Sequence, residues 1–135
     1  PVIAQTGKGT YAPQAMEARE KIAPADFEEL VGKARLIVAH AGIGTVLTAA
    51  RCRKPILLMP RRASLAEHRN DHQMATVRRL AGRPGILVAM DETELPARIA
   101  EGLALTNWNS VQSATARQLN AALSSFIENR SFDRF

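Results

Sequence analysis

The sequence predicts an α/β fold in which a parallel sheet is covered by helices on both faces. Short apolar runs alternate along the chain with segments whose apolar residues recur at helical spacing. The connections between them are short, as in domains built from alternating strands and helices. The runs at 35–40 and 55–60 are continuously apolar, which is typical of strands buried on both faces of a parallel sheet. We therefore expect a Rossmann-like, doubly wound sheet.

The first part of the chain is expected to hold four strands and two helices. Pro24 suits the first turn of a helix, and Asp26 suits the positive end of its dipole. Lys54-Pro55 ends the second helix, because proline cannot continue it. The first strand is expected to be buried and to end at Gly7. The predicted strands are 1–7, 16–22, 35–40 and 55–60, and the predicted helices are 24–34 and 42–52.

The second part is expected to add one strand, 85–90, between helices. A polar loop after residue 60 becomes a helix whose apolar face is formed by Met74, Val77, Leu80 and Ala81. Asp91 or Thr93 is the expected cap of a helix within 91–105. An apolar stripe predicts a last, packing helix at 110–129, and the whole chain, 1–135, is expected to form one domain.

The charge and the cysteine count limit the possible partners and compartments. Eighteen Lys and Arg against thirteen Asp and Glu give a net charge of +5, which favours anionic partners. Nucleic acid is not expected, because the basic residues are not interleaved with aromatic ones. A single cysteine, Cys52, excludes an internal disulfide framework and indicates a reducing compartment. With no apolar run of membrane-spanning length and no visible signal peptide, we expect a cytoplasmic protein.

The stretch "VAHAGIGTV", residues 38–46, places a glycine-rich turn between a buried strand and a helix. Gly42 and Gly44 allow a sharp turn and a close approach of ligand, and the helix N-terminus offers N–H groups to an anion. Thr45 adds a hydroxyl, and His40 stands at the end of the strand. A nucleoside diphosphate needs such a turn, but a tight turn without ligand, with His40 as a packing residue, explains it equally well.

A second dense polar stretch, residues 60–76, follows the next buried strand and is expected to open onto the same crevice. Its side chains suit the hydroxyls and phosphates of a sugar nucleotide. The alternative is a charged helix face. The polar residues are Arg61, Arg62, Glu67, His68, Arg69, Asn70, Asp71, His72 and Gln73.

The histidines also allow a metal-dependent hydrolase. His68 and His72 are spaced i, i+4, and His40 is a possible third ligand. Arg69 beside His68 disfavours a cation, and the run is not H-E-x-x-H. We therefore expect no metal site.

Three motifs in order resemble the C-terminal domain of family 28 glycosyltransferases. They are "HAGIGT" at 40–45, "KPILLMP" at 54–60 and "NDHQ" at 70–73, and "VIAQTG" at 2–7 is similar to an early strand of the small catalytic subunits in this group. The likeness covers most of 2–105 and extends to bacterial exopolysaccharide enzymes.

The resemblance implies the donor-binding half of a GT-B enzyme that transfers a GlcNAc-like sugar from a UDP-sugar with inversion, without metal or other cofactor. The acceptor would be a lipid-linked glycan of cell-envelope or exopolysaccharide synthesis, at the inner face of the membrane. A membrane-associated acceptor-binding subunit or an N-terminal domain would supply the catalytic base, so no catalytic residue is assigned, and the chain is a candidate homo-oligomer. The implied donor-binding residues are Thr6, Gly7, His40, Gly42, Gly44, Thr45, Thr48, Arg61, Glu67, Asn70, His72 and Gln73.

Within that set the resemblance implies distinct contacts. Gly42, Gly44 and Thr45 would face the diphosphate, and Thr6 and Gly7 would line the nucleotide crevice. The donor sugar would face Gln73, together with Asn70 or His72.

The sequence departs from the family pattern at two points. Thr48 stands where the family usually has an acid that holds the ribose hydroxyls, and Glu67 is a possible substitute. The opening strand and its glycine loop are expected to be missing. A non-catalytic nucleotide-sugar-binding or regulatory module on the same fold is the alternative function, and it would bind donor without turnover.

Overall fold

A computed structural model of the chain describes residues 1–66, 72–105 and 121. The chain divides into two compact units, Pro1–Leu30 and Val31–Phe135, and each is described by itself. Parallel strands and helices make up both units, which confirms the predicted α/β class. The strands form two sheets, one of two strands and one of three, where the sequence predicted one sheet. Whether the chain acts as a single domain stays a prediction.

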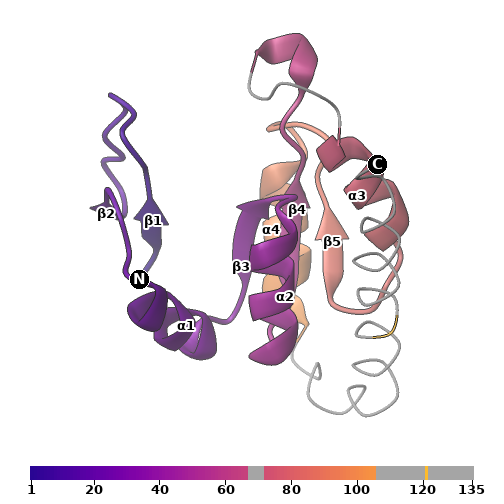
Figure 1. Ribbon diagram of the computed structural model, residues 1–135, viewed down its shortest axis with the longest axis horizontal. Coiled ribbons are helices and arrows are strands. Elements are labelled where there is room, and N and C mark those ends of the chain that lie inside the picture. The colour runs from indigo at the N-terminus through magenta and orange to yellow at the C-terminus, as the bar shows by residue number, and fades with distance from the viewer. Residues whose placement is uncertain (67–71, 106–120, 122–135) are drawn as a thin grey trace, which may run out of the picture. The chain divides into compact units, whose positions relative to one another are not determined.

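The first unit contains a pair of parallel strands, β1 (Ile3–Gln5) and β2 (Glu17–Arg19), in which Ile3 pairs with Glu17 (Figure 1). Helix α1 (Pro24–Lys33) begins at the predicted proline. The prediction that the first strand is buried is wrong, since Ile3 is 36% exposed. A two-stranded layer covers few of its own side chains, which the apolar letters of the strand did not reveal. Gly7 follows β1 with φ of 64°, a conformation that favours glycine.

The second unit is built on a three-stranded parallel sheet with the order β3-β4-β5. In its register Ile37 pairs with Ile56, and Ile56 with Ile86. The strands are β3 (Ile37–His40), β4 (Ile56–Met59) and β5 (Ile86–Val88); the helices are α2 (Ile43–Arg51), the 3₁₀ turn η1 (Ala63–Leu65), α3 (His72–Leu80) and α4 (Leu95–Ala104) (Figure 1).

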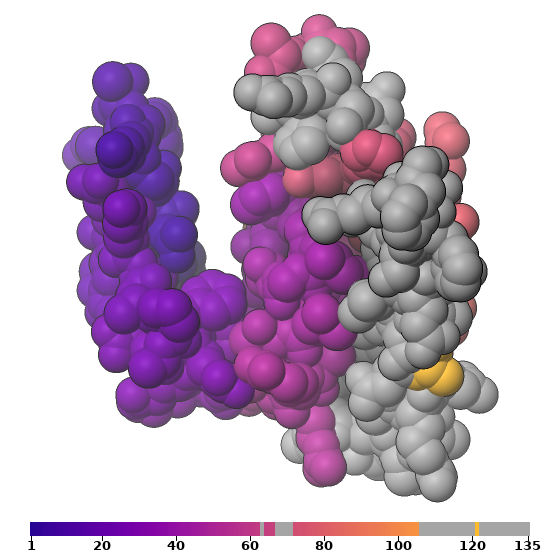
Figure 2. All heavy atoms as spheres, in the orientation of Figure 1, coloured from indigo at the N-terminus to yellow at the C-terminus, as the bar shows by residue number. Residues whose placement is uncertain are grey.

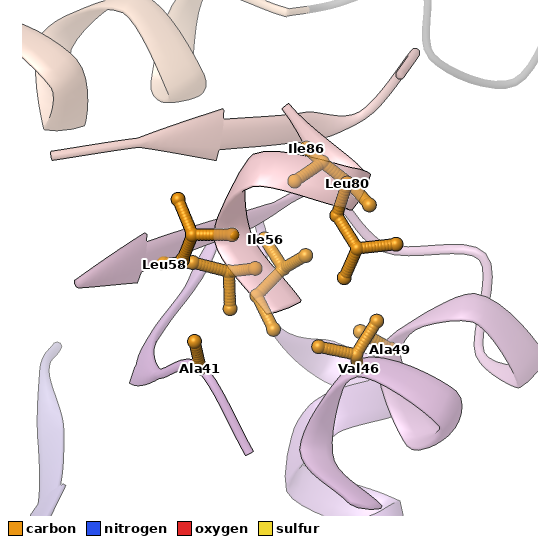
Figure 3. Packing of buried hydrophobic residues seen from close by; sticks show 8 residues of the cluster. Ala41, Val46, Ala49, Ile56, Leu58, Leu80 and Ile86 are labelled. Atoms are coloured by element: carbon orange, nitrogen blue, oxygen red, sulfur yellow. The ribbon is translucent and has the colours of Figure 1, made fainter. Parts of the chain in front are cut away.

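Helices cover both faces of this sheet. On one face, β4 packs against α2 and α3, and the shared cluster contains Ala41, Val46, Ala49, Ile56, Leu58, Val77, Leu80 and Ile86 (Figure 3). On the other face, α4 approaches so closely that a Cβ at Gly102 would lie 2.8 Å from methyls of Leu36 and 2.9 Å from one of Leu87. The sheet of this unit is thus doubly wound, as predicted.

Two expectations for the second part differ from the structure. Helix α4 begins at Leu95 with Glu94 at the N-cap, so neither Asp91 nor Thr93 caps it. Asp91 instead closes the preceding turn, where its Oδ1 accepts hydrogen bonds from the backbone N–H and the hydroxyl of Thr93. In α3, Val77 and Leu80 are buried as predicted, whereas Ala81 is exposed beyond the end of the helix.

The predicted packing helix at 110–129 lies outside the described residues, apart from Ala121. None of the helices described is both long enough and apolar enough to cross a membrane.

Candidate functional site

The candidate site lies at the edge of the second unit where β3 and β4 end. The strands are parallel neighbours, and His40 at the end of β3 pairs with Met59 at the end of β4. The segments that follow each strand, the turn into α2 and the loop with η1, therefore start side by side. Side chains of the loop, among them Arg61, Ser64 and Leu65, are exposed, and the loop lies at the surface in Figure 2. In open α/β sheets ligands bind at this edge.

Helix α2 starts directly after β3 and leaves its first turn uncapped. Gly42 is the N-cap, and no side chain there bonds to the backbone. The first turn holds no acid either. The N–H groups of Ile43, Gly44 and Thr45 have no acceptor within the helix, because the first intrahelical bond runs from Val46 N to Gly42 O. These groups and the positive end of the helix dipole suit an anionic ligand.

The two glycines of this turn are not required by the fold. Gly42 has φ of −84° and ψ of 128°, an extended conformation that any residue adopts, so the turn does not depend on the conformational freedom of glycine there. Apart from the neighbouring backbone, a Cβ built on Gly42 or on Gly44 meets no atom of the described residues within 4 Å. The absence of a side chain thus leaves free space over the helix N-terminus, into which a ligand can reach the backbone.

Gln73, in the first turn of α3, is 9% exposed and is one of two buried polar residues among those described. Its Oε1 accepts a hydrogen bond of 2.9 Å from the backbone N–H of Arg61, just past the end of β4. Because the amide oxygen faces an N–H donor, the orientation of the group is fixed and Nε2 keeps two N–H donors. No described residue accepts from Nε2.

Thr48 follows Gly44 by one helical turn on the same face of α2. Its Oγ1 donates a hydrogen bond of 3.1 Å to the Gly44 carbonyl oxygen, so its single proton is engaged within the helix. Thr45 is half-buried in the first turn, and His40 is exposed at the end of β3. His40 has a polar partner of its own.

The turn after β5 lies at the same edge of the sheet, although the sequence did not lead us to expect it in the candidate site. Arg62 forms an ion pair of 3.6 Å with Glu92, and Glu94 accepts a hydrogen bond of 2.9 Å from Met90 N. The hydroxyl and N–H of Thr93, bonded to Asp91, hold the pKa of that carboxyl below its ordinary value. In the sequence, Asp91, Glu92 and Glu94 directly follow a predicted strand, which indicates the candidate edge. They were interpreted instead as the start of a helix.

Charge is distributed unevenly around the site. From Leu30 to Ala66 the chain contains no Asp or Glu. The same stretch contains seven cations: Lys33, Arg35, Arg51, Arg53, Lys54, Arg61 and Arg62. Of these cations only Arg61 and Arg62 follow a strand end at the candidate edge, where Asp91, Glu92 and Glu94 follow β5. The other five stand before β3 or between the end of α2 and β4, at the opposite edge of the sheet. The feature of this edge that suits an anion is therefore the N-terminus of α2.

The remaining predicted site residues lie in the first unit or outside the described residues, apart from His72. Thr6 and Gly7 belong to the first unit, where the Thr6 N–H donates to Arg19 O at 2.9 Å and Gly7 N to Glu20 O at 3.1 Å. Glu67 and Asn70 lie outside the described residues, as does His68.

His72 is exposed at the start of α3 and has a polar partner. In the part of the chain that the structure describes, no three His, Cys, Asp or Glu side chains are placed to hold a metal ion. Because His68 lies outside the described residues, the set His40, His68 and His72 is not tested there.

Comparison with known proteins supports a glycosyltransferase. Two chains called UDP-N-acetylglucosamine transferase subunit ALG13, from two strains of Cryptococcus neoformans var. neoformans serotype D, are 42% identical over 48 residues. That match covers 34% of this chain and 24% of those relatives. A crystal structure of the glycotransferase of kitacinnamycin shares the fold, with a TM-score of 0.64 and 17% identity over 94% of this chain and 34% of that one.

The family comparison covers almost the whole chain. Residues 1–129 match the model of the glycosyltransferase family 28 C-terminal domain, which confirms the resemblance read from the three motifs. The chain therefore belongs to glycosyltransferase family 28 and contains its C-terminal domain.

Proposed function

We propose that this chain is the donor-binding domain of an inverting glycosyltransferase that uses a UDP-sugar, with GlcNAc or a closely related sugar as the transferred group. The observation that carries the proposal is the uncapped start of α2, where Gly42 and Gly44 leave the backbone open although the fold does not require glycine at Gly42. The diphosphate would accept hydrogen bonds from the N–H groups of Ile43, Gly44 and Thr45.

Gln73 supports the sugar end of this arrangement. Its oxygen is held by Arg61 N, so its amide N–H groups are fixed in direction before any ligand arrives. A buried donor of this kind suits a sugar hydroxyl or a phosphate oxygen at the same edge of the sheet. Asn70 or His72, which both precede Gln73 in the sequence, is proposed as a further sugar contact.

The chemistry that this site would assist is a single displacement at the anomeric carbon. The acceptor hydroxyl oxygen forms a bond to that carbon, and the bond from the carbon to the β-phosphate oxygen breaks, with inversion. The hydroxyl proton passes to a base, and the released diphosphate carries the negative charge. The N-terminus of α2 stabilises that charge as it develops, which lowers the barrier.

The acceptor side is a further part of the proposal. We propose a lipid-linked acceptor in cell-envelope or exopolysaccharide synthesis, and a partner subunit or N-terminal domain that holds it and supplies the base. The word "subunit" in the name of the ALG13 relatives supports a two-part enzyme. The match covers 24% of the length of those relatives. Action at the cytoplasmic face of the membrane is proposed because the single cysteine indicates a reducing compartment and the family resemblance implies a lipid-linked acceptor.

Isothermal titration of the protein with UDP-GlcNAc, UDP and UMP, with and without EDTA, tests the proposal. We expect UDP to bind at least about tenfold more tightly than UMP, since the second phosphate adds charged hydrogen bonds at the helix N-terminus. EDTA should leave the affinities unchanged. Equal affinity for UDP and UMP, or no binding, would contradict the diphosphate site. Binding without transfer in the presence of the partner half and acceptor would favour the non-catalytic module.

A further inference from the structure

The edge of the second unit opposite the candidate site gathers basic side chains. The three strands start in register there, because Ile37 pairs with Ile56 and Ile56 with Ile86. The segments that precede the strands therefore lie side by side, at the lower end of this sheet in Figure 1. Together with the last turns of α2 and α3 they hold seven cations, which we call the basic edge: Arg35, Arg51, Arg53, Lys54, Arg78, Arg79 and Arg83.

The helix ends account for part of this charge and not for all of it. Three of the seven cations lie in the last turns of α2 and α3, where they offset the negative ends of the helix dipoles. The other four lie in the connecting turns, outside the helices. Five of the seven residues are exposed, and Lys54 and Arg83 are half-buried. The charge of the basic edge therefore stands at the surface and exceeds what the helices use.

Two apolar side chains are exposed beside the basic edge. Leu103 and Leu105, at the end of α4, are each 39% exposed. Nη2 of Arg35 donates a hydrogen bond of 3.0 Å to the carbonyl oxygen of Leu103, which places the end of α4 next to a cation of this edge. Cations beside exposed leucines suit the boundary between the phosphate headgroups and the acyl chains of a bilayer.

We propose that the basic edge binds the surface of a membrane that contains anionic phospholipids, with Leu103 and Leu105 inserted at the level of the headgroups. Six of the seven cations are arginines, whose planar guanidinium groups can each donate two hydrogen bonds to one phosphate. Nucleic acid suits this surface less well. The segments 34–36, 51–55, 78–85 and 101–105 contain no aromatic side chain on which a base could stack.

This surface is separate from the candidate donor site and goes beyond the proposed function. The glycine turn into α2 follows the carboxyl end of β3, whereas the basic edge precedes the strands. A membrane on the basic edge therefore leaves the opposite edge, with the candidate site, open to a soluble donor.

Vesicle flotation of the full chain tests the proposal. The vesicles contain phosphatidylcholine alone or phosphatidylcholine mixed with phosphatidylglycerol. We expect binding to the mixed vesicles to be at least about tenfold tighter and to weaken as the salt concentration rises, because salt screens the charges. No nucleotide is present, so the result does not depend on whether the chain binds UDP-sugars. Equal binding to both kinds of vesicle, or binding to neither, would overturn the proposal.

Matched charge variants locate the surface. Arg51, Arg53 and Arg79 have polar partners in the protein, so the cations replaced are Lys54 and Arg78. We expect Lys54→Gln with Arg78→Gln to weaken binding to the mixed vesicles by about tenfold or more. The control pair removes two exposed cations of the first unit.

The control variant, Lys8→Gln with Lys21→Gln, has the same net charge as the test variant. We expect it to weaken binding by less than about threefold, because its cations lie outside the basic edge. Equal weakening by the two pairs, with native circular dichroism in both, would mean that overall charge attracts the vesicles. That outcome would overturn the proposal.

A second pair of variants tests the exposed leucines. We expect Leu105→Gln to weaken binding to the mixed vesicles by about threefold or more, because an apolar contact with the bilayer is lost. Leu65→Gln is the control, since Leu65 is 54% exposed on η1 at the opposite edge, and it should bind as the wild type does. Wild-type binding by Leu105→Gln would overturn the insertion of the leucines.

Two other partners of a basic surface are distinguished by the same proteins. Binding of a DNA duplex at physiological salt, without binding to vesicles, would make nucleic acid the partner. Self-association in analytical ultracentrifugation that Lys54→Gln with Arg78→Gln abolishes, again without binding to vesicles, would make the partner a second copy of the chain. Either result would overturn the proposal.

Discussion

The backbone N–H of Arg61 donates a hydrogen bond of 2.9 Å to Oε1 of Gln73, which joins the end of β4 to the first turn of α3. In the proposed function this one amide has two roles: its oxygen holds the scaffold, and its nitrogen binds the ligand. The roles can be separated by substitution, because glutamate keeps an acceptor and removes the donors.

Gln73→Ala is expected to impair both roles. It leaves Arg61 N without its acceptor, which should cost about 1–3 kcal/mol of unfolding free energy, and donor binding should weaken by about 1–3 kcal/mol. Gln73→Glu is expected to retain more of the stability and to lose donor binding, because a carboxylate repels the diphosphate. Chemical denaturation and isothermal titration measure the two effects. Wild-type affinity in Gln73→Glu would remove Gln73 from the donor site.

Gly44 is expected to respond in opposite directions in stability and binding. A Cβ there meets no atom of the described residues within 4 Å beyond its own helix backbone. Gly44→Ala should therefore raise the unfolding free energy by up to about 1 kcal/mol through reduced entropy of the unfolded chain. Gly44→Val should block the diphosphate sterically while the thermal melt stays near that of wild type. Unchanged affinity for UDP in a folded Gly44→Val variant would exclude this helix N-terminus as the phosphate site.

Arg53 holds a left-handed conformation, with φ of 55°, at the end of α2. Its N–H donates to Ala50 O at 3.1 Å and Lys54 N donates to Ala49 O at 2.9 Å, which is the Schellman pattern that usually ends in glycine. We expect Arg53→Gly to stabilise the protein by about 0.5–1 kcal/mol in urea denaturation. Arg51→Gly, inside the helix, is the control and should destabilise it by a similar amount. If both variants were stabilised, the left-handed conformation of Arg53 would not explain the effect.

Gly102 is required for the close packing of α4 on the sheet. An added Cβ would approach methyls of Leu36 and Leu87 to within 2.9 Å, so Gly102→Ala should destabilise the protein by about 1–3 kcal/mol. Gly32, a helical glycine with nothing within 4 Å, is the matched control, and Gly32→Ala should be neutral or stabilising. Thermal melts of both variants provide the comparison. Equal effects would mean that contact with the two leucines is not the cause.

Asp91 makes the stability of the protein depend on pH, and the direction of that dependence follows from the hydrogen bonds of its carboxylate. Its pKa in the folded protein lies below the ordinary 3.8, chiefly because the Thr93 hydroxyl donates to it. The stabilisation is therefore present above that ordinary value and is lost as the pH falls through the lowered pKa. Thr93→Val should raise the pKa of Asp91 towards 3.8, measured from its carboxyl resonance by NMR. If the pKa of Asp91 does not rise in Thr93→Val, the Thr93 hydroxyl is not the cause of the lowered pKa.

Much of the second unit was predictable from local pattern. The apolar runs at 35–40 and 55–60 contain β3 and β4, and Pro24 marks the start of α1, because burial and backbone chemistry act on short stretches. Strand neighbours were not predictable in the same way. Alternating strands and helices indicate parallel pairing, yet they do not say that β1 pairs with β2 in a sheet of its own.

The site was predictable in position and less so in detail. Strand ends followed by Gly42 and by Gln73 indicated the edge, since parallel strands expose their carboxyl ends together. The hydrogen bonds that these side chains make within the protein could not be predicted. The sequence does not show that Gln73 accepts from Arg61 N, that Thr48 donates to Gly44 O, or that Asp91 accepts from Thr93 in a turn. These hydrogen bonds depend on distances of about 3 Å, which residue spacing does not encode.

The measurement that tests the central claim most directly is the titration of ¹⁵N-labelled protein with UDP-GlcNAc, followed by amide chemical shifts. The account predicts the largest changes at the N–H groups of Ile43, Gly44 and Thr45 and at the side-chain amide of Gln73, with Gly44→Val losing them. Saturable binding that leaves these four signals unmoved would contradict the account, because the ligand would then lie away from the start of α2.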